Sequence, residues 1–296
     1  MYYSKNTKVF LNGNFINAMD AQVSIYSQSL HYGSGVFEGI RSYMTDDGVK
    51  IFKAKEHYER LLFSAKKLHI KLDYTVDELI LLTEELLKKN KLSDAYIRPL
   101  AFVGINMSLL PTDDSNLFIS AWKWDRYLGS GGIKVVTSPF ERPNPKSCFV
   151  ETKATGHYVN SILASTDAKA KGYDEALLLD QNGFIAEGPG ANFFFEKNDK
   201  LYTPKIGNIL PGITRATIID LAKDLGYKVE EGQYKLEDVY GADSAFYTGT
   251  AVEVANFKSL DKNVFHKDWH TTIGYELSLA YNQLVLEKYH SPAAVI

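Results

Sequence analysis

The sequence has very little cysteine. Cys148 is the single cysteine among 296 residues, so no disulfide can form within the chain. This excludes the small extracellular proteins that depend on a disulfide framework, and it favours a reducing compartment.

Long apolar runs and an excess of basic residues are also missing. No window approaches the roughly 18 apolar residues that a membrane-spanning helix needs, and the first residues lack the apolar segment of a signal peptide. The formal net charge is −3, which disfavours a nucleic-acid-binding protein because such proteins usually carry a basic patch. We therefore expect a cytoplasmic enzyme.

The composition is that of a globular protein, with 45% hydrophobic and 23% charged residues. A chain of this length forms one large domain or two smaller ones. The run Gly129-Ser130-Gly131-Gly132 is the best linker candidate because it is flexible and packs poorly. We expect a small N-terminal α/β domain at 1–128, a linker at 129–132 and a larger cofactor-binding domain at 133–296.

Helix and strand patterns are mixed along the chain. Asn12-Gly13 predicts a tight turn between two strands, and Thr75 with Glu78 predicts a capping box that begins a helix. Further strands are expected at 96–103, 117–122, 133–137, 175–179, 192–196, 244–247 and 253–257, and helices at 158–171, 216–225 and 273–289. Because strands and helices do not alternate strictly, we expect mixed α/β and α+β domains and not a Rossmann sheet.

Several segments could carry chemistry, although each has a plain structural interpretation too. Lys153 is flanked by small residues before a helix, which on its own is more typical of a surface lysine. Gly212 lets a ligand approach the backbone, and Thr214 would be the N-cap of a helix whose first N–H groups could hold a phosphate. Hydroxyl groups surround a glycine in Thr248-Gly249-Thr250, and Glu187 lies in a glycine-rich bend.

Two N-terminal segments suggest a substrate pocket. Residues 31–41 combine three glycines with aromatic side chains. Tyr96 and Arg98 lie two apart on an expected strand, so both side chains face one side of the sheet. Arginine binds carboxylates in a bidentate fork, although an ion pair within the sheet would explain Arg98 equally well.

The order of these segments resembles the fold-type IV class of pyridoxal-phosphate enzymes over nearly the whole chain. Three stretches are similar to branched-chain amino acid aminotransferases in particular: 32–41, 96–100 and Leu210-Pro211-Gly212-Ile213-Thr214-Arg215. The resemblance implies two domains with the active site between them. It also implies transfer of an amino group between leucine, isoleucine or valine and 2-oxoglutarate.

The resemblance assigns the cofactor contacts residue by residue. Lys153 matches the lysine that holds pyridoxal 5'-phosphate as a Schiff base and then acts as base and acid at carbon. Glu187 matches the carboxylate opposite the pyridine nitrogen, whose proton it retains. The remaining contacts are Tyr158 at the phenolic oxygen, Leu210 under the ring, and Arg60, Ile213, Thr214 and Thr250 around the phosphate. No residue is assigned to a metal.

The substrate contacts follow in the same way. Tyr96, Thr250 and Ala251 match the residues that hold the α-carboxylate, while Arg98 and Tyr32 match the site for the distal carboxylate of glutamate. Phe37, Trp124 and Tyr127 match the apolar side-chain pocket. Tyr32 is implied to come from a neighbouring subunit, so the resemblance implies at least a homodimer, with a hexamer as a larger alternative.

Some alternatives remain open at this stage. The family often has Glu where this chain has Ala191, and many relatives have Ser-Gly-Thr where it has Thr248-Gly249-Thr250. A D-amino acid aminotransferase or an aminodeoxychorismate lyase would share the fold and the cofactor site. A non-catalytic cofactor-binding protein is a rival from another class, against which the retention of Lys153 and Glu187 counts.

Overall fold

The computed structural model describes residues 2–124 and 132–291. The chain divides into two compact units: Met1–Asp125 with Thr152–His157, and Arg126–Glu151 with Tyr158–Ile296. The expected linker at 129–132 lies outside the described residues except for Gly132. In the described chain, no helix is long and apolar enough to cross a membrane.

The first unit is built on an antiparallel sheet. Among the described residues it has seven strands, ordered β2-β1-β7-β6-β4-β5 with β3 paired to β6. Their bounds are β1 Lys8–Leu11, β2 Asn14–Asn17, β3 Gly35–Phe37, β4 Ile40–Thr45, β5 Gly48–Ile51, β6 Ala95–Val103 and β7 Ser115–Lys123. The expected turn between β1 and β2 is confirmed: Asn12 and Gly13 both have positive φ, as a two-residue hairpin turn requires.

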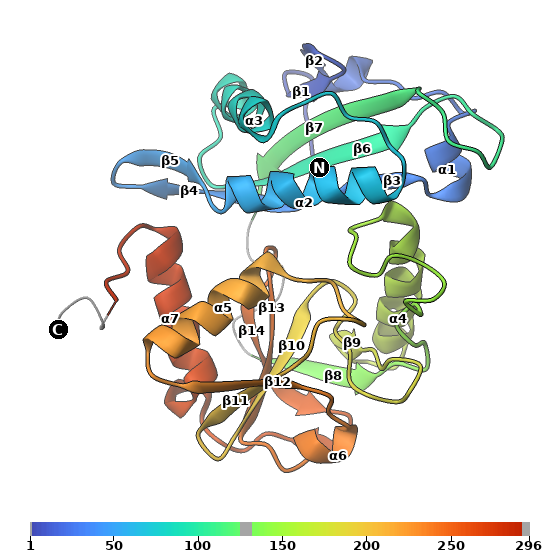
Figure 1. Ribbon diagram of the computed structural model, residues 1–296. Helices are drawn as coiled ribbons and strands as arrows, with labels where there is room; N and C mark the ends of the chain where they lie inside the picture. Colours follow the sequence, from blue (N-terminus) through green and yellow to red (C-terminus); the bar gives the residue numbers. More distant parts are fainter. Residues whose placement is uncertain (1, 125–131, 292–296) are drawn as a thin grey trace. The chain divides into compact units, whose positions relative to one another are not determined.

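Two helices cover one face of this sheet (Figure 1), α2 Ala54–Lys67 and α3 Val76–Asn90. Thr75 and Glu78 form the predicted capping box at the start of α3. Ile97, Ala101 and Val103 of β6 pack into the core with these helices. Because side chains alternate along a strand, Tyr96 and Arg98 lie on the opposite face. A shorter helix, α1 Gln28–Tyr32, precedes β3.

The segment that carries Lys153 packs with the first unit, although the expected boundary put it in the second domain. The reason is backbone bonding to the segment around β3. The Phe37 N–H donates to the Lys153 carbonyl at 3.1 Å, and the Gly156 N–H donates to the Gly33 carbonyl at 3.2 Å. Val36 and Ala154 form an isolated bridge between these bonds.

The second unit is built on a larger, mixed sheet. Its described part has eight strands, ordered β12-β11-β10-β13-β14-β8-β9 with β15 paired to β14. The strands are β8 Ile133–Thr137, β9 Glu175–Leu177, β10 Asn192–Lys197, β11 Lys200–Pro204, β12 Lys228–Gly232, β13 Ser244–Gly249, β14 Glu253–Leu260 and β15 Asn263–Val264. The helices are α4 Tyr158–Ala170, α5 Ile213–Asp224, α6 Leu236–Val239 and α7 Ile273–Val285.

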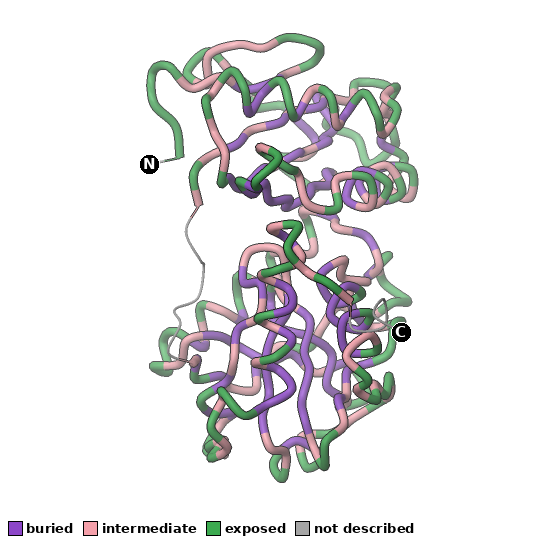
Figure 2. Tube along the Cα trace, turned by 90° about the vertical axis from the view of Figure 1, so that its left-hand side faces the viewer, coloured by how far each residue is buried: buried purple, intermediate pink, exposed green. Residues whose placement is uncertain are grey.

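Buried residues follow the central strands of both sheets (Figure 2), with Phe193, Phe194 and Phe246 fully buried in the second. α5 and α7 lie side by side against its sheet (Figure 1). Two expected helix bounds were wrong. The last helix ends at Val285, and α5 begins at Ile213.

The predicted N-cap was also wrong. Gly212 occupies the N-cap position of α5, and Thr214 lies inside the first turn. A built Cβ at Gly212 would lie 1.9 Å from Oδ1 of Asn192, so the close approach of that side chain requires glycine there.

Candidate functional site

Three of the expected site residues meet on the open face of the first sheet. The Phe37 ring lies at their centre, with the Arg98 guanidinium carbon 4.6 Å and the Lys153 Nζ atom 5.1 Å from its centroid. A cation over an aromatic face is attracted by the ring quadrupole. The Phe37 ring therefore contacts both the lysine that the sequence assigns to the cofactor and the arginine that it assigns to the substrate.

Tyr96 and Arg98 point the same way, as the strand spacing predicts. The Arg98 guanidinium donates to the Tyr96 hydroxyl at 3.1 Å. The Tyr96 ring packs 5.2 Å from the Trp124 ring, which adds Trp124 to the same cluster. Tyr96 needs a glycine beside it, because a built Cβ at Gly39 would lie 2.0 Å from the tyrosine hydroxyl.

Arg98 is suited to a ligand that carries a carboxylate. Its Nε atom is buried and has no hydrogen-bond partner in the part of the chain that the structure describes. An unsatisfied buried donor is costly, and a guanidinium satisfies it best with a carboxylate. The alternative interpretation, an ion pair within the sheet, predicts a partner for this atom that the described residues do not supply.

Arg60 is held by a buried carboxylate. Its Nε donates to Oε1 of Glu38 at 2.7 Å and its terminal nitrogen donates to Oε2 at 2.9 Å. Nδ1 of His57 lies 2.7 Å from the same Oε2. Burial alone would raise the pKa of Glu38, but the neighbouring Arg60 and His57 hold that pKa well below its usual range.

The second unit holds Glu187 in a fixed network. Nδ2 of Asn192 donates to Oε2 of Glu187 at 2.9 Å, and the Leu210 N–H donates to Oε1 at 3.1 Å. Oε1 also accepts from Nε of Arg142 at 2.5 Å. Glu187 is 5% exposed, so the charge of Arg142 and these hydrogen bonds compensate its burial.

The start of α5 is shaped for an anion. Its first turn contains no acidic residue, Thr214 is buried there, and the nearest intrahelical bond runs from the Ala216 N–H to the Gly212 carbonyl. The unpaired N–H groups and the positive end of the helix dipole favour a phosphate. Arg215 has a separate structural role, since it donates to Glu231 at 2.6 Å and to the Pro204 carbonyl.

The loop after β13 lies beside the glycine-rich bend. A built Cβ at Gly249 would contact the Gly190 carbonyl at 3.3 Å and Cα of Ala191 at 3.6 Å. The buried Oγ1 of Thr248 has no partner in the described part of the chain, and Thr250 and Ala251 follow directly. An unmet hydroxyl at the end of β13, beside this loop, fits a ligand with anionic oxygens.

These residues fit pyridoxal phosphate. The start of α5 suits its phosphate, and Glu187 offers a carboxylate fixed by three donors to its pyridine nitrogen. Lys153 and Arg60 belong to the first unit, while Tyr158, Glu187, Leu210, Ile213, Thr214 and Thr250 belong to the second. Tyr32 ends α1 and is half exposed, and Tyr127 lies outside the described residues.

Comparison with known proteins decides the family. A model of the family described as class IV aminotransferases matches residues 35–260, most of the chain. The chain belongs to the class IV aminotransferases. It is a pyridoxal-phosphate enzyme of fold type IV, as the sequence predicts.

Several class IV aminotransferases align with this chain over nearly their whole length. A branched-chain-amino-acid aminotransferase of Pseudomonas aeruginosa is 38% identical over 286 residues, which cover 95% of this chain and 93% of that protein. The branched-chain aminotransferase of Thermoproteus uzoniensis with norvaline superposes with a TM-score of 0.92 at 37% identity, over 95% of each chain. The branched-chain amino acid aminotransferase of Thermobaculum terrenum in its PLP-form gives a TM-score of 0.91 at 32% identity, over 96% of each chain.

Some residues of this aminotransferase site could not be predicted from the sequence. Asn192 follows the glycine-rich bend that contains Glu187, but nothing in its spacing shows that it connects Glu187 to Leu210. Arg142 lies 45 residues before its partner Glu187, so no local pattern connects the two. Glu38 directly follows Phe37 within residues 32–41, and a carboxylate between an aromatic residue and a glycine was the signal available.

Proposed function

We propose that this enzyme transfers the amino group of L-leucine, L-isoleucine or L-valine to 2-oxoglutarate, with pyridoxal phosphate attached to Lys153. The observation that carries the proposal is the shared surface of Phe37 and Arg98, whose ring and guanidinium lie 4.6 Å apart. An apolar ring suits a branched side chain, and a guanidinium with an unmet donor suits the second carboxylate of glutamate. Similar proteins named as branched-chain aminotransferases support the same substrates.

The cofactor contacts divide by chemistry. Arg60, Ile213, Thr214 and Thr250 would bind the phosphate, Leu210 would contact the ring, and Tyr158 would donate to the phenolic oxygen. Glu187 would face the ring nitrogen and keep a proton on it, because three donors hold this carboxylate in place. The cofactor, when bound, supplies a ring that accepts the electron pair left on the substrate's Cα.

Lys153 moves the proton. With pyridoxal phosphate and an amino acid bound, the Lys153 amine would take the proton from the substrate's Cα and would later donate a proton at the cofactor carbon. The Phe37 N–H holds the Lys153 carbonyl and the Ser64 hydroxyl accepts from the Lys153 N–H at 3.2 Å, so the backbone of the base is fixed on both sides. A fixed base loses less entropy on reaching the reacting carbon.

The proposed substrate contacts explain how one pocket accepts both a branched-chain amino acid and glutamate. Tyr96, Thr250 and Ala251 hold the α-carboxylate that every substrate shares. Phe37 and Trp124 would form the apolar wall, to which the sequence resemblance also assigns Tyr127, and Arg98 with Tyr32 would receive the distal carboxylate of glutamate. Leucine, isoleucine and valine differ by a methylene or by branching, which is worth only about 1–3 kcal/mol in a pocket, so all three should react.

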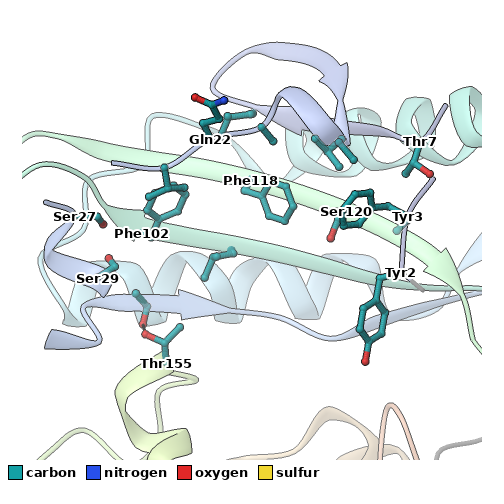
Figure 3. A pocket seen from close by; sticks show the side chains of 18 of the residues that line it. Tyr2, Tyr3, Thr7, Gln22, Ser27, Ser29, Phe102, Phe118, Ser120 and Thr155 are labelled. Atoms are coloured by element: carbon teal, nitrogen blue, oxygen red, sulfur yellow. Dashed lines mark hydrogen bonds between the residues drawn. The ribbon is translucent and has the colours of Figure 1, made fainter. Parts of the chain in front are cut away.

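We further propose that the enzyme is at least a homodimer, in which Tyr32 reaches the site of a second copy. The open face of the first sheet continues past Arg98 into a cavity of about 570 Å³. Figure 3 shows Phe102 and Phe118 pointing into it from neighbouring strands, with Tyr2 and Tyr3 from the N-terminal segment. Exposed apolar side chains accompany it, including Val23, Ile25, Leu30 and Ile105, and apolar patches of this kind are typical of an interface.

A donor panel tests the proposal. Purified enzyme is incubated with 2-oxoglutarate and each of the L and D forms of leucine, isoleucine, valine and alanine, and glutamate formation is measured. We expect product with the three branched L-amino acids. Product from D-amino acids alone would identify a D-amino acid aminotransferase, and pyruvate release from aminodeoxychorismate would identify the lyase. A protein whose cofactor absorbance does not change with L-glutamate would be a non-catalytic binder.

A further inference from the structure

Glu38 is a buried carboxylate with no part in the proposed chemistry. It is fully buried and pairs with Arg60, which is 12% exposed, and with His57, which is 2% exposed. Burying an ionised group is expensive unless its partners compensate it, and such a network rarely adds to stability over well-packed apolar residues. Glu38 therefore calls for a role that an apolar side chain could not supply.

The helix spacing concentrates polar groups beside Glu38. His57, Arg60 and Ser64 are three and four positions apart, so they lie on one face of α2. Ser64 accepts a hydrogen bond from the Lys153 N–H at 3.2 Å. Glu38 directly follows Phe37, whose N–H binds the Lys153 carbonyl. The carboxylate thus lies between the arginine assigned to the phosphate and the segment of the lysine assigned to the aldehyde.

The geometry of the Arg60 contact is specific. Two parallel bonds of 2.7 and 2.9 Å join Nε and a terminal nitrogen to the two oxygens of Glu38. Such a fork fixes the plane of the guanidinium and the directions of its other N–H groups. His57 contacts the second oxygen at 2.7 Å, which limits rotation of the carboxylate. A long side chain that would otherwise lose rotamer freedom on binding is ordered in advance.

We propose that Glu38 is a positioning residue that holds Arg60 in the orientation in which it binds the cofactor's phosphate. The inference rests on the proposed role of Arg60. It differs from a purely structural role in one measurable respect: loss of Glu38 should weaken the grip on the phosphate and leave the rest of the cofactor's binding unchanged.

The test compares pyridoxal phosphate with pyridoxal, which lacks the phosphate. Full-length wild type and Glu38→Gln are loaded with each, and dissociation constants are obtained from the loss of cofactor absorbance on dilution. We expect Glu38→Gln to lower the affinity for pyridoxal phosphate by about 10- to 100-fold, the usual cost of losing a charge-assisted hydrogen bond. The affinity for pyridoxal should fall by less than about twofold. Glu175→Gln, a buried carboxylate bonded to Ser165 elsewhere in the chain, is the matched control and should change neither.

Two further variants separate the inference from the proposed function. Arg60→Ala should lose affinity for pyridoxal phosphate selectively, and adding Glu38→Gln to it should cause no further loss. If Arg60→Ala binds the phosphate form normally, the proposed role of Arg60 is wrong. Suppose instead that Arg60→Ala loses affinity for pyridoxal phosphate. If Glu38→Gln then binds it normally, or loses equal affinity for pyridoxal phosphate and pyridoxal, the role of Glu38 is wrong and that of Arg60 stands.

Arg60→Lys covers the case in which Glu38→Gln does not fold. Lysine keeps the positive charge opposite the carboxylate but cannot form the fork. We expect a selective loss for pyridoxal phosphate in this variant. Normal affinity for pyridoxal phosphate would show that charge alone suffices, and the positioning role of Glu38 would be overturned.

Discussion

The Arg98 guanidinium lies 4.6 Å from the centroid of the Phe37 ring. The contact places an apolar surface and a cation side by side within one unit of the molecule. The same ring lies 5.1 Å from Nζ of Lys153. A branched apolar side chain and a second carboxylate could therefore each contact a matching surface close to the lysine to which we assign the cofactor, as transamination between unlike substrates requires.

Lys153→Ala should lose covalent attachment of the cofactor and nearly all transamination, while the fold survives. Alanine has no amine to attach the aldehyde or to move the proton. Borohydride reduction followed by peptide mass analysis measures the attachment. Lys146→Ala, which alters an exposed lysine, is the control and should keep wild-type labelling. Cofactor bound covalently to another lysine in Lys153→Ala would show that the assignment is wrong.

Glu187→Gln should bind cofactor but slow the exchange of the substrate's Cα proton by several orders of magnitude. Glutamine has a similar shape but cannot retain a proton on the ring nitrogen by charge. Deuterium incorporation into L-leucine, followed by NMR, measures the step without the rest of the turnover. A near-normal exchange rate would contradict the role given to Glu187.

His57→Asn should make the enzyme less sensitive to mild acid. Burial lowers the pKa of His57 in the folded state, although Glu38 opposes the shift. The unfolded chain therefore takes up a proton near pH 6.5 that the folded chain accepts only at lower pH, so stability is full above this value and falls with acidification. The slope for one proton is at most about 1.4 kcal/mol per pH unit.

Urea unfolding between pH 7.5 and pH 5 measures this dependence. We expect the decline with falling pH to be shallower in His57→Asn than in wild type. The exposed His266 serves as the control, and we expect His266→Asn to keep the wild-type slope. A slope equal to that of wild type in His57→Asn would show that His57 does not resist protonation in the folded state.

Local sequence patterns predicted much of the fold because turns and helix caps depend on interactions between neighbouring residues. Asn12-Gly13 and the capping box at Thr75 need only neighbouring residues, and both are confirmed. Thr214 was expected to cap α5, but the cap position is Gly212, where the approach of the Asn192 side chain from another strand decides the geometry. Such a contact joins residues far apart along the chain and leaves no periodic signal.

The site shows the same division. Tyr96 and Arg98 could be placed on one face from strand periodicity alone, and the hydrogen bond between them confirms it. The partners of Glu187 could not be predicted, because Arg142 and Leu210 approach it through the fold and not along the chain. The packing of Lys153 with the first unit was likewise set by backbone bonds to the segment around β3.

The dual use of the pocket is tested most directly by the two half-reactions of Arg98→Leu. Single-turnover rates with L-leucine and with L-glutamate separate the substrates that steady-state rates combine. Tyr96→Phe is the matched control on the same strand, and it should weaken both half-reactions by similar factors. In Arg98→Leu we expect the glutamate half-reaction to fall far more than the leucine half-reaction, because only glutamate brings a second carboxylate that would be buried without a partner. Equal losses with leucine and glutamate would mean that Arg98 is structural or holds the α-carboxylate, and would contradict the account.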